Sequence, residues 1–171
     1  MSFIGIVSDI KSFENLKERI KDIDKNNVIN LIHVNRKSIE NIKNIKFETI
    51  VIENELNKLE DYMFTLEKIC CDSKYILLNT DINTDISILK KQKKNIITYG
   101  LNQKSTVTIS SISENNILIY LQRSIKNKND KWLDVEEKKI KLRENKQCKV
   151  YEIMIIYILL MIYDDCIIDE I

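Results

Sequence analysis

Residues 74–112 read KYILLNTDINTDISILKKQKKNIITYGLNQKSTVTISSI, and this stretch decides the predicted fold. Two apolar runs, Tyr75–Leu78 and Asn95–Tyr99, end in polar residues, which is typical of buried strands in an α/β sheet. The alternating run Thr106–Ile112 predicts a further strand. Such sheets bind ligands at the carboxyl ends of parallel strands, so we expect a ligand site near Asn79-Thr80-Asp81.

The chain before residue 74 repeats the alternation of strand and helix. The predicted strands are Phe3–Val7, Val28–Val34 and Phe47–Ile52. Apolar residues at helical spacing predict helices from Phe13 to Ile23, from Ile39 to Ile45 and from Leu56 to Cys70. A further short helix is predicted from Ile86 to Leu89, within the stretch quoted above. Strands separated by helices predict a three-layer α/β domain with a mainly parallel sheet of about five strands over residues 1–104.

The pattern changes after Gly100, where strands follow one another without helices between them. Predicted strands at Thr106–Ile112, Ile117–Arg123 and Trp132–Leu142 form an antiparallel extension of two to three strands within residues 105–148. Trp132 and Leu133 are expected to begin a strand that faces the core.

Val150–Tyr163, VYEIMIIYILLMIY, is the most apolar stretch of the chain. It is shorter than the about 20 residues that a membrane span needs, and it contains Glu152. We therefore predict a buried helix within residues 149–164, no membrane span, and a tail at residues 165–171 that is mobile or lies at an edge. The whole chain, residues 1–171, is expected to form a single domain.

Composition excludes several classes of function. The 171 residues are 44% hydrophobic, which is enough for a substantial core, and 27 basic residues balance 26 acidic ones, so no nucleic-acid partner is expected. With no C-x-x-C pair and one histidine, His33, no metal site is expected. The four cysteines, Cys70, Cys71, Cys148 and Cys166, are predicted to be reduced, mostly buried thiols of a cytoplasmic protein, with a vicinal redox switch at Cys70–Cys71 as the alternative.

From about Phe47 to Tyr163 the order of motifs resembles the central, ATP-binding domain of the Mur ligases, which join amino acids to the peptidoglycan precursor. Four segments carry the resemblance. Asn79-Thr80-Asp81 is similar to the family's N-x-D-D segment, and Ile96-Ile97-Thr98-Tyr99-Gly100 with the strand after it is similar to its I-T-Y/F-G strand. The other two are the helix Val150–Tyr163 and, more loosely, Asp61–Glu67, which is similar to the end of the family's D-H-L-D-x-H-x-T-x-E stretch.

The departures from this family bear on activity. The family has a Gly-rich loop with Lys and Ser/Thr after its first strand, whereas this chain has Ser8-Asp9-Ile10-Lys11-Ser12 and no G-K-[ST] anywhere. Leu59 falls near the family's magnesium-binding histidine, and Lys74 is out of register with its modified lysine. We therefore predict a degenerate relative with no catalytic residues. No cofactor is expected, because these losses place ATP and magnesium binding in doubt.

The resemblance nominates Asn79 and Asp81, together with Tyr99, as nucleoside-binding residues, because the family's Asn of N-x-D lies at the adenine side of its nucleotide. Further candidates at the strand ends are Ser8, Asp9, Asn35, Glu53 and Asn54. The alternative interpretation is that polar residues end strands because turns favour Asn and Asp.

Three functions follow from these patterns. The first is a non-catalytic binding, scaffolding or regulatory module linked to peptidoglycan or spore-envelope metabolism. The second is a residual nucleotide-binding or ligase-type protein that needs a partner for activity. The third is an interaction subunit that binds a protein partner or another copy through an exposed apolar patch at Ile167, Ile168 and Ile171.

Overall fold

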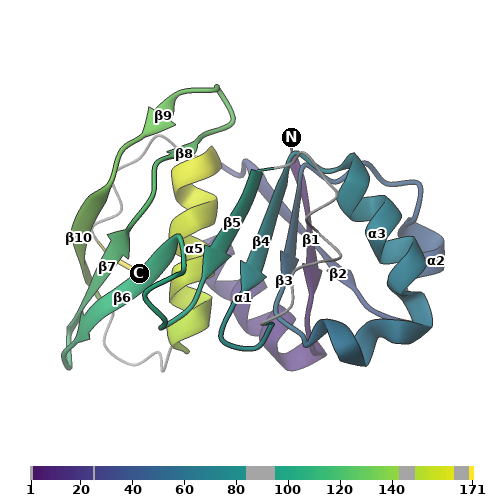
Figure 1. Cartoon of the computed structure of the whole chain (residues 1–171), viewed down its shortest axis with the longest axis horizontal. Coiled ribbons are helices and arrows are strands. Elements are labelled where there is room, and N and C mark those ends of the chain that lie inside the picture. Colours follow the sequence, from purple (N-terminus) through teal and green to yellow (C-terminus); the bar gives the residue numbers. More distant parts are fainter. Residues whose placement is uncertain (1, 25, 84–94, 143–148, 164–169) are drawn as a thin grey trace.

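The computed structural model describes residues 2–24, 26–83, 95–142, 149–163 and 170–171. Within these residues the main sheet has eight strands in the order β10-β7-β6-β5-β4-β3-β1-β2 (Figure 1). Its strands are β1 Ser2–Val7, β2 Ile29–Val34, β3 Thr49–Ile52, β4 Tyr75–Asn79, β5 Asn95–Tyr99, β6 Val107–Ile112, β7 Asn116–Leu121 and β10 Glu136–Lys141; β8 Ile125–Lys126 and β9 Trp132–Leu133 form a separate hairpin.

The predicted α/β class, with a mainly parallel sheet and an antiparallel extension, is confirmed. Strands β1 to β5 pair in parallel. Strand β6 also pairs in parallel with β5, through Tyr99 and Val107, so the chain reverses between β6 and β7 and not directly after Gly100. The parallel part therefore has six strands where about five were expected, and β7 runs antiparallel to both of its neighbours, β6 and β10.

Helices cover both faces of the sheet because side chains of the central strands alternate between two cores. In β3 and β4, Val51 and Leu77 belong to the core shared with α1 (Ile10–Ile23) and α5 (Val150–Tyr163). Their neighbours belong to the core shared with α2 (Ile39–Ile42) and α3 (Met63–Asp72). The single long helix predicted from Leu56 is wrong, since the segment begins as the 3₁₀ helix η1, Leu56–Tyr62.

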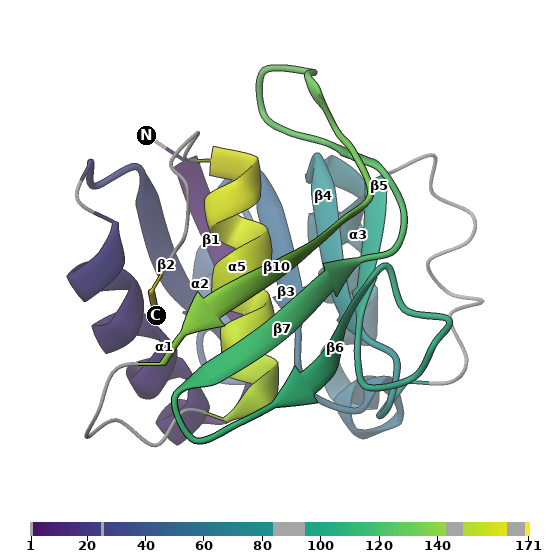
Figure 2. The ribbon, with the colours of Figure 1, turned by 90° about the vertical axis from the view of Figure 1, so that its left-hand side faces the viewer.

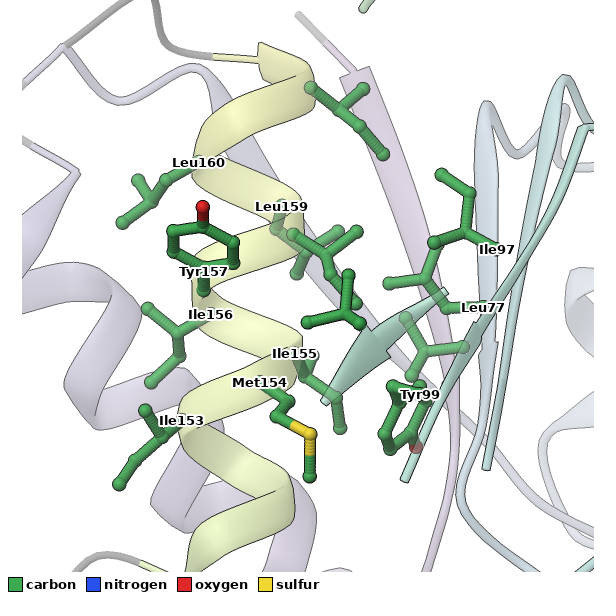
Figure 3. Packing of buried hydrophobic residues seen from close by; sticks show 14 of the residues in the cluster. Leu77, Ile97, Tyr99, Ile153, Met154, Ile155, Ile156, Tyr157, Leu159 and Leu160 are labelled. Carbon is green, nitrogen blue, oxygen red and sulfur yellow. The ribbon is translucent and has the colours of Figure 1, made fainter. Parts of the chain in front are cut away.

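Helix α5 has the bounds that its apolar run predicts, and it is buried along almost its whole length. The sheet curls around it, so that β4 and β5 pack on one side while β7 and β10 lie on the other (Figures 2 and 3). A helix that is apolar all round requires this kind of enclosure. Among the described residues, no helix is long and apolar enough to cross a membrane.

The expectations for Trp132, for the C-terminal apolar patch and for the helix at 86–89 are wrong or concern residues that the structure does not describe. Trp132 does not face the core: it is 59% exposed, and Lys126 Nζ lies 5.0 Å from its ring centroid. Ile171 is buried, and its N–H donates to Lys141 O at 2.9 Å, so it is not part of an exposed patch. Ile167, Ile168 and the helix expected at 86–89 lie outside the described residues.

Cys148 and Cys166 lie outside the described residues, and the two described cysteines differ in their surroundings. Cys70 is buried in α3 and Cys71 is exposed. Burial raises the pKa of the Cys70 thiol to about 12, and the neighbouring Cys71 and Glu67 add to the increase. Since a reactive thiol needs a lowered pKa, Cys70 is a packing residue, and the expectation of mostly buried thiols does not hold for Cys71.

Candidate functional site

The carboxyl ends of the parallel strands meet the first turns of α1 and α5 at one edge of the sheet. Ile52 pairs with Leu78, and Asn79 pairs with Tyr99, so Glu53, Asn79 and Tyr99 follow at the same level on adjacent strands. They come two positions after Val51, Leu77 and Ile97, and side chains two positions apart on a strand lie on the same face. All three therefore lie on the face covered by α1 and α5. We refer to Asp9, Ser12, Glu53, Tyr99, Tyr151 and Glu152 as the Glu53 cluster.

The turn between β1 and α1 is very short. Only Ser8 and Asp9 separate Val7 from Ile10, where the helix begins. Asp9 is the N-cap residue: its carboxylate accepts a hydrogen bond from Ser12 N at 2.9 Å. The hydroxyl of Ser12 in turn lies 3.3 Å from both carboxylate oxygens of Glu53, to which it donates. The short turn thus brings α1 directly against the end of β3.

The electrostatics of the cluster centre on Glu53. Burial raises the pKa of its carboxyl to about 7; the negative charges of Glu152 and Asp9 add to the increase, while the Ser12 hydroxyl and Lys149 act against it. Glu152 is almost fully buried in the first turn of α5, and Arg19 Nε lies 3.7 Å from its Oε2. Glu53 therefore titrates near neutral pH inside a set of acidic groups.

Tyr99 contributes a buried aromatic ring to the cluster. Its side chain is fully buried, and its Oη has no hydrogen-bond partner among the described residues. Its ring meets the Tyr151 ring edge to face, with centroids 6.5 Å apart. Burial raises the pKa of Tyr99 well above its ordinary value, and Glu53 and Tyr151 raise it further.

Asp81 holds three segments together beside the cluster. Its carboxylate accepts hydrogen bonds from Leu101 N at 2.6 Å, Asn102 Nδ2 at 2.8 Å and the Tyr151 hydroxyl at 3.1 Å. Partial burial acts to raise the pKa of Asp81, but these hydrogen bonds outweigh it and lower the pKa. Asp81 N also donates to Asn79 Oδ1 at 3.0 Å, so two of the three nominated nucleoside-binding residues, Asn79 and Asp81, already make hydrogen bonds within the turn after β4.

The remaining strand-end candidates belong to local turns. Asn35 Oδ1 accepts from the N–H groups of Lys37 and Ser38 at the start of α2. Asn54 O accepts from Asn83 Nδ2 at 3.1 Å, and Ser8 O lies 2.8 Å from His33 Nε2. The structure therefore gathers Asp9, Glu53 and Tyr99, and it gives Ser8, Asn35 and Asn54 turn contacts.

Sequence reasoning did not nominate Ser12, Tyr151 or Glu152, although all three belong to the cluster. The signal for Ser12 was its place three residues after Asp9, the position whose N–H an N-cap side chain binds. Tyr151 and Glu152 stand at the start of an apolar helix, where an acidic residue is favoured by the helix dipole. No group of three or more His, Cys, Asp or Glu residues within the described ranges is arranged to hold a metal ion.

No family model and no curated protein matches this sequence. The Mur ligase resemblance and the nucleoside role of Asn79, Asp81 and Tyr99 thus stay predictions.

Proposed function

We propose that this chain is a non-catalytic binding module on a Mur ligase-like core, and that it does not hold a triphosphate. The observation that carries the proposal is the turn between β1 and α1. A phosphate-binding loop of the G-x-x-x-x-G-K-[ST] kind needs about eight residues whose backbone N–H groups surround the phosphates. Here Ser8 and Asp9 make the whole connection, and neither is glycine.

The helix end that would receive a phosphate also carries an anion of the chain itself. A helix N-terminus attracts anions through its free N–H groups and its dipole. In α1 the Asp9 carboxylate already accepts the N–H of Ser12, and the Glu53 carboxylate accepts the Ser12 hydroxyl. A phosphate placed about 4 Å from either carboxylate would meet a repulsion of about 1 kcal/mol in water and about 4 kcal/mol in partly buried surroundings.

Two other positions support the absence of ligase chemistry. Leu59, near the place of the family's magnesium-binding histidine, is buried in the core with α3 and carries no ligand atom. Lys74 precedes β4 and so lies at the opposite, amino-terminal edge of the sheet, where its Nζ donates to Lys128 O at 3.0 Å. The link to peptidoglycan or spore-envelope metabolism is part of this proposal and rests on the sequence resemblance.

The proposal is tested by titrating the full chain with ATP, ADP and UDP-linked peptidoglycan precursors, with and without magnesium. Calorimetry and thermal unfolding are expected to show no binding at millimolar concentration, and no magnesium-dependent release of phosphate from ATP. Magnesium-dependent ATP turnover by the purified chain would overturn the proposal.

The alternative, a residual nucleotide-binding protein, predicts a different result in the same titration. It requires binding that Asn79→Ala weakens, with Asn35→Ala as the matched control at another strand end. The hydrogen bond from Asp81 N to Asn79 Oδ1 argues against it, because the side chain already has a partner in its own turn.

A further inference from the structure

Tyr99 leaves a buried polar group unpaired at the edge of the sheet. Its hydroxyl is fully buried without a hydrogen-bond partner among the described residues, which is unfavourable because the group has given up its hydrogen bonds to water. Figure 3 shows the ring beside α5, with the hydroxyl directed toward the N-terminal end of that helix. Glu53 and Tyr151 both act on the hydroxyl electrostatically. The unpaired oxygen therefore points into the Glu53 cluster.

Among the residues that the structure describes, the charges around this oxygen are mainly negative. Asp9 and Glu152 both act on Glu53 from the first turns of the two helices, and Arg19 is paired with Glu152. Lys149 is exposed and has the weakest effect on Glu53. A ligand that complements carboxylate and phenol oxygens is a donor with a positive charge.

Apolar side chains are exposed at the same edge of the sheet as these acceptors. Ile10 is 56% exposed after β1, Ile82 is 40% exposed after β4, and Leu101 is 52% exposed after β5. Three separate strand ends thus present apolar surface at the edge that carries the carboxylates. This combination fits a protein surface in which a basic side chain is flanked by apolar ones, and a small free amine would leave the apolar groups uncovered.

We propose that the Glu53 cluster binds the ammonium group of a lysine side chain from a partner protein, with Glu53 and Tyr99 Oη as its acceptors. Lysine fits better than arginine, because a compact ammonium has three donors that reach separate acceptors, whereas a guanidinium needs a flat, paired acceptor. Ile10, Ile82 and Leu101 contact the apolar residues beside that lysine. This inference rests on the proposed function as a binding module and adds the chemistry of the partner.

Binding of a lysine ammonium has a characteristic pH dependence. The groups that face Glu53 are Asp9 and Ser12 from α1, Glu152 and Lys149 from α5, and Tyr99 from β5. With a pKa of about 7 for Glu53, its ionised fraction rises about tenfold between pH 6 and pH 8, and the affinity for a cation rises by the same factor. At pH 7 binding also releases protons, which calorimetry in two buffers of different ionisation enthalpy detects.

The test uses NMR titrations of the ¹⁵N-labelled full chain with three probes. They are acetyl-Gly-Leu-Lys-Leu-Gly-amide, the same peptide with Gln in place of Lys, and n-butylammonium chloride. The Lys peptide is expected to shift amide signals around Glu53 and Tyr99 and to bind about tenfold more tightly at pH 8 than at pH 6. The Gln peptide and n-butylammonium are expected to bind at least tenfold more weakly.

Variants separate a binding role from a structural one. Glu53→Gln is expected to weaken binding of the Lys peptide at least tenfold, whereas Glu55→Gln, which removes a charge paired with Lys58 at the surface, leaves it unchanged. Tyr99→Phe is expected to weaken binding without lowering the melting temperature, because it removes a hydroxyl that lacks a partner. A purely structural hydroxyl would give the opposite pattern.

The outcomes distinguish this inference from the proposed function. Equal binding of the Lys and Gln peptides, or no shifts with either, overturns the lysine site and leaves the absence of triphosphate binding standing. Equal affinity for n-butylammonium overturns the assignment to a protein partner. Binding of ATP with magnesium in a parallel titration instead overturns the proposed function.

Discussion

The charge of Glu53 is expected to make the protein less stable above neutral pH than below it. The pKa of the Glu53 carboxyl is about 7 in the folded chain, against an ordinary value of 4.5. The folded chain therefore holds this proton more tightly than the unfolded chain does, and the stability that results is complete below pH 4.5 and lost as pH rises through 7. At 1.36 kcal/mol for each pKa unit, the total loss is about 3 kcal/mol.

The measurement compares wild type with Glu53→Gln, which keeps the shape of the side chain and removes its titration. Urea unfolding followed by far-UV circular dichroism gives the free energy of unfolding of each chain at several pH values. The two chains are expected to be similar near pH 4.5, with the variant becoming more stable by about 2.5 kcal/mol between pH 5 and pH 8. Other titrating groups cancel in the difference.

Glu55→Gln provides the matched control, because it removes the same charge two residues away, where the carboxylate pairs with Lys58 at 2.8 Å on the surface. A difference between wild type and Glu53→Gln that stays constant from pH 5 to pH 8 would refute the reasoning. It would mean that burial and the carboxylates of Glu152 and Asp9 do not act on Glu53 as the geometry implies.

Three further substitutions test the packing around the site and the core, each by urea unfolding at a fixed pH. Gly100→Ala is expected to cost about 1–3 kcal/mol, because its Cβ would lie 2.8 Å from Asp81 Oδ1, and an unchanged stability would show that Asp81 moves aside freely. Tyr163→Phe is expected to cost about 1–3 kcal/mol by leaving the buried Thr49 hydroxyl without its 2.6 Å partner, whereas a neutral result would contradict that bond. Ile171→Ala is expected to cost about 2 kcal/mol if the last residue is part of the core, and no loss would place it outside.

The fold was largely predictable because its strands and its central helix are buried on more than one side. Runs such as Tyr75–Leu78 are apolar throughout, since both faces of the central strands are covered by helices. The bounds of α5 followed from an apolar run flanked by polar residues. The direction of β6 was not predictable, because pairing of Tyr99 with Val107 depends on how the intervening loop folds back, which alternation alone does not specify.

The candidate site was predictable only as far as the sheet itself. The rule that ligands bind at strand ends nominated Asp9, Glu53 and Tyr99. It does not identify the layer that covers those ends, so Tyr151 and Glu152 were missed although they decide the environment of Tyr99 and Glu53. The prediction that Trp132 faces the core was wrong for a different reason. An aromatic residue beside Leu133 suggested burial, but its strand belongs to a separate hairpin outside the main sheet.

The short turn after β1 supports the kind of ligand that we propose for this edge of the sheet. In a phosphate-binding loop, the free N–H groups of the helix face an anion brought by the ligand. Here Asp9 supplies that anion, and the two-residue connection brings Ser12 within reach of Glu53 as well. The charge that the ligand would have brought is thus built into the protein, together with a second carboxylate and the unpaired oxygen of Tyr99. The lysine ammonium that we propose for this edge completes such an arrangement, and its charge is opposite to that of the phosphate that a glycine-rich loop binds.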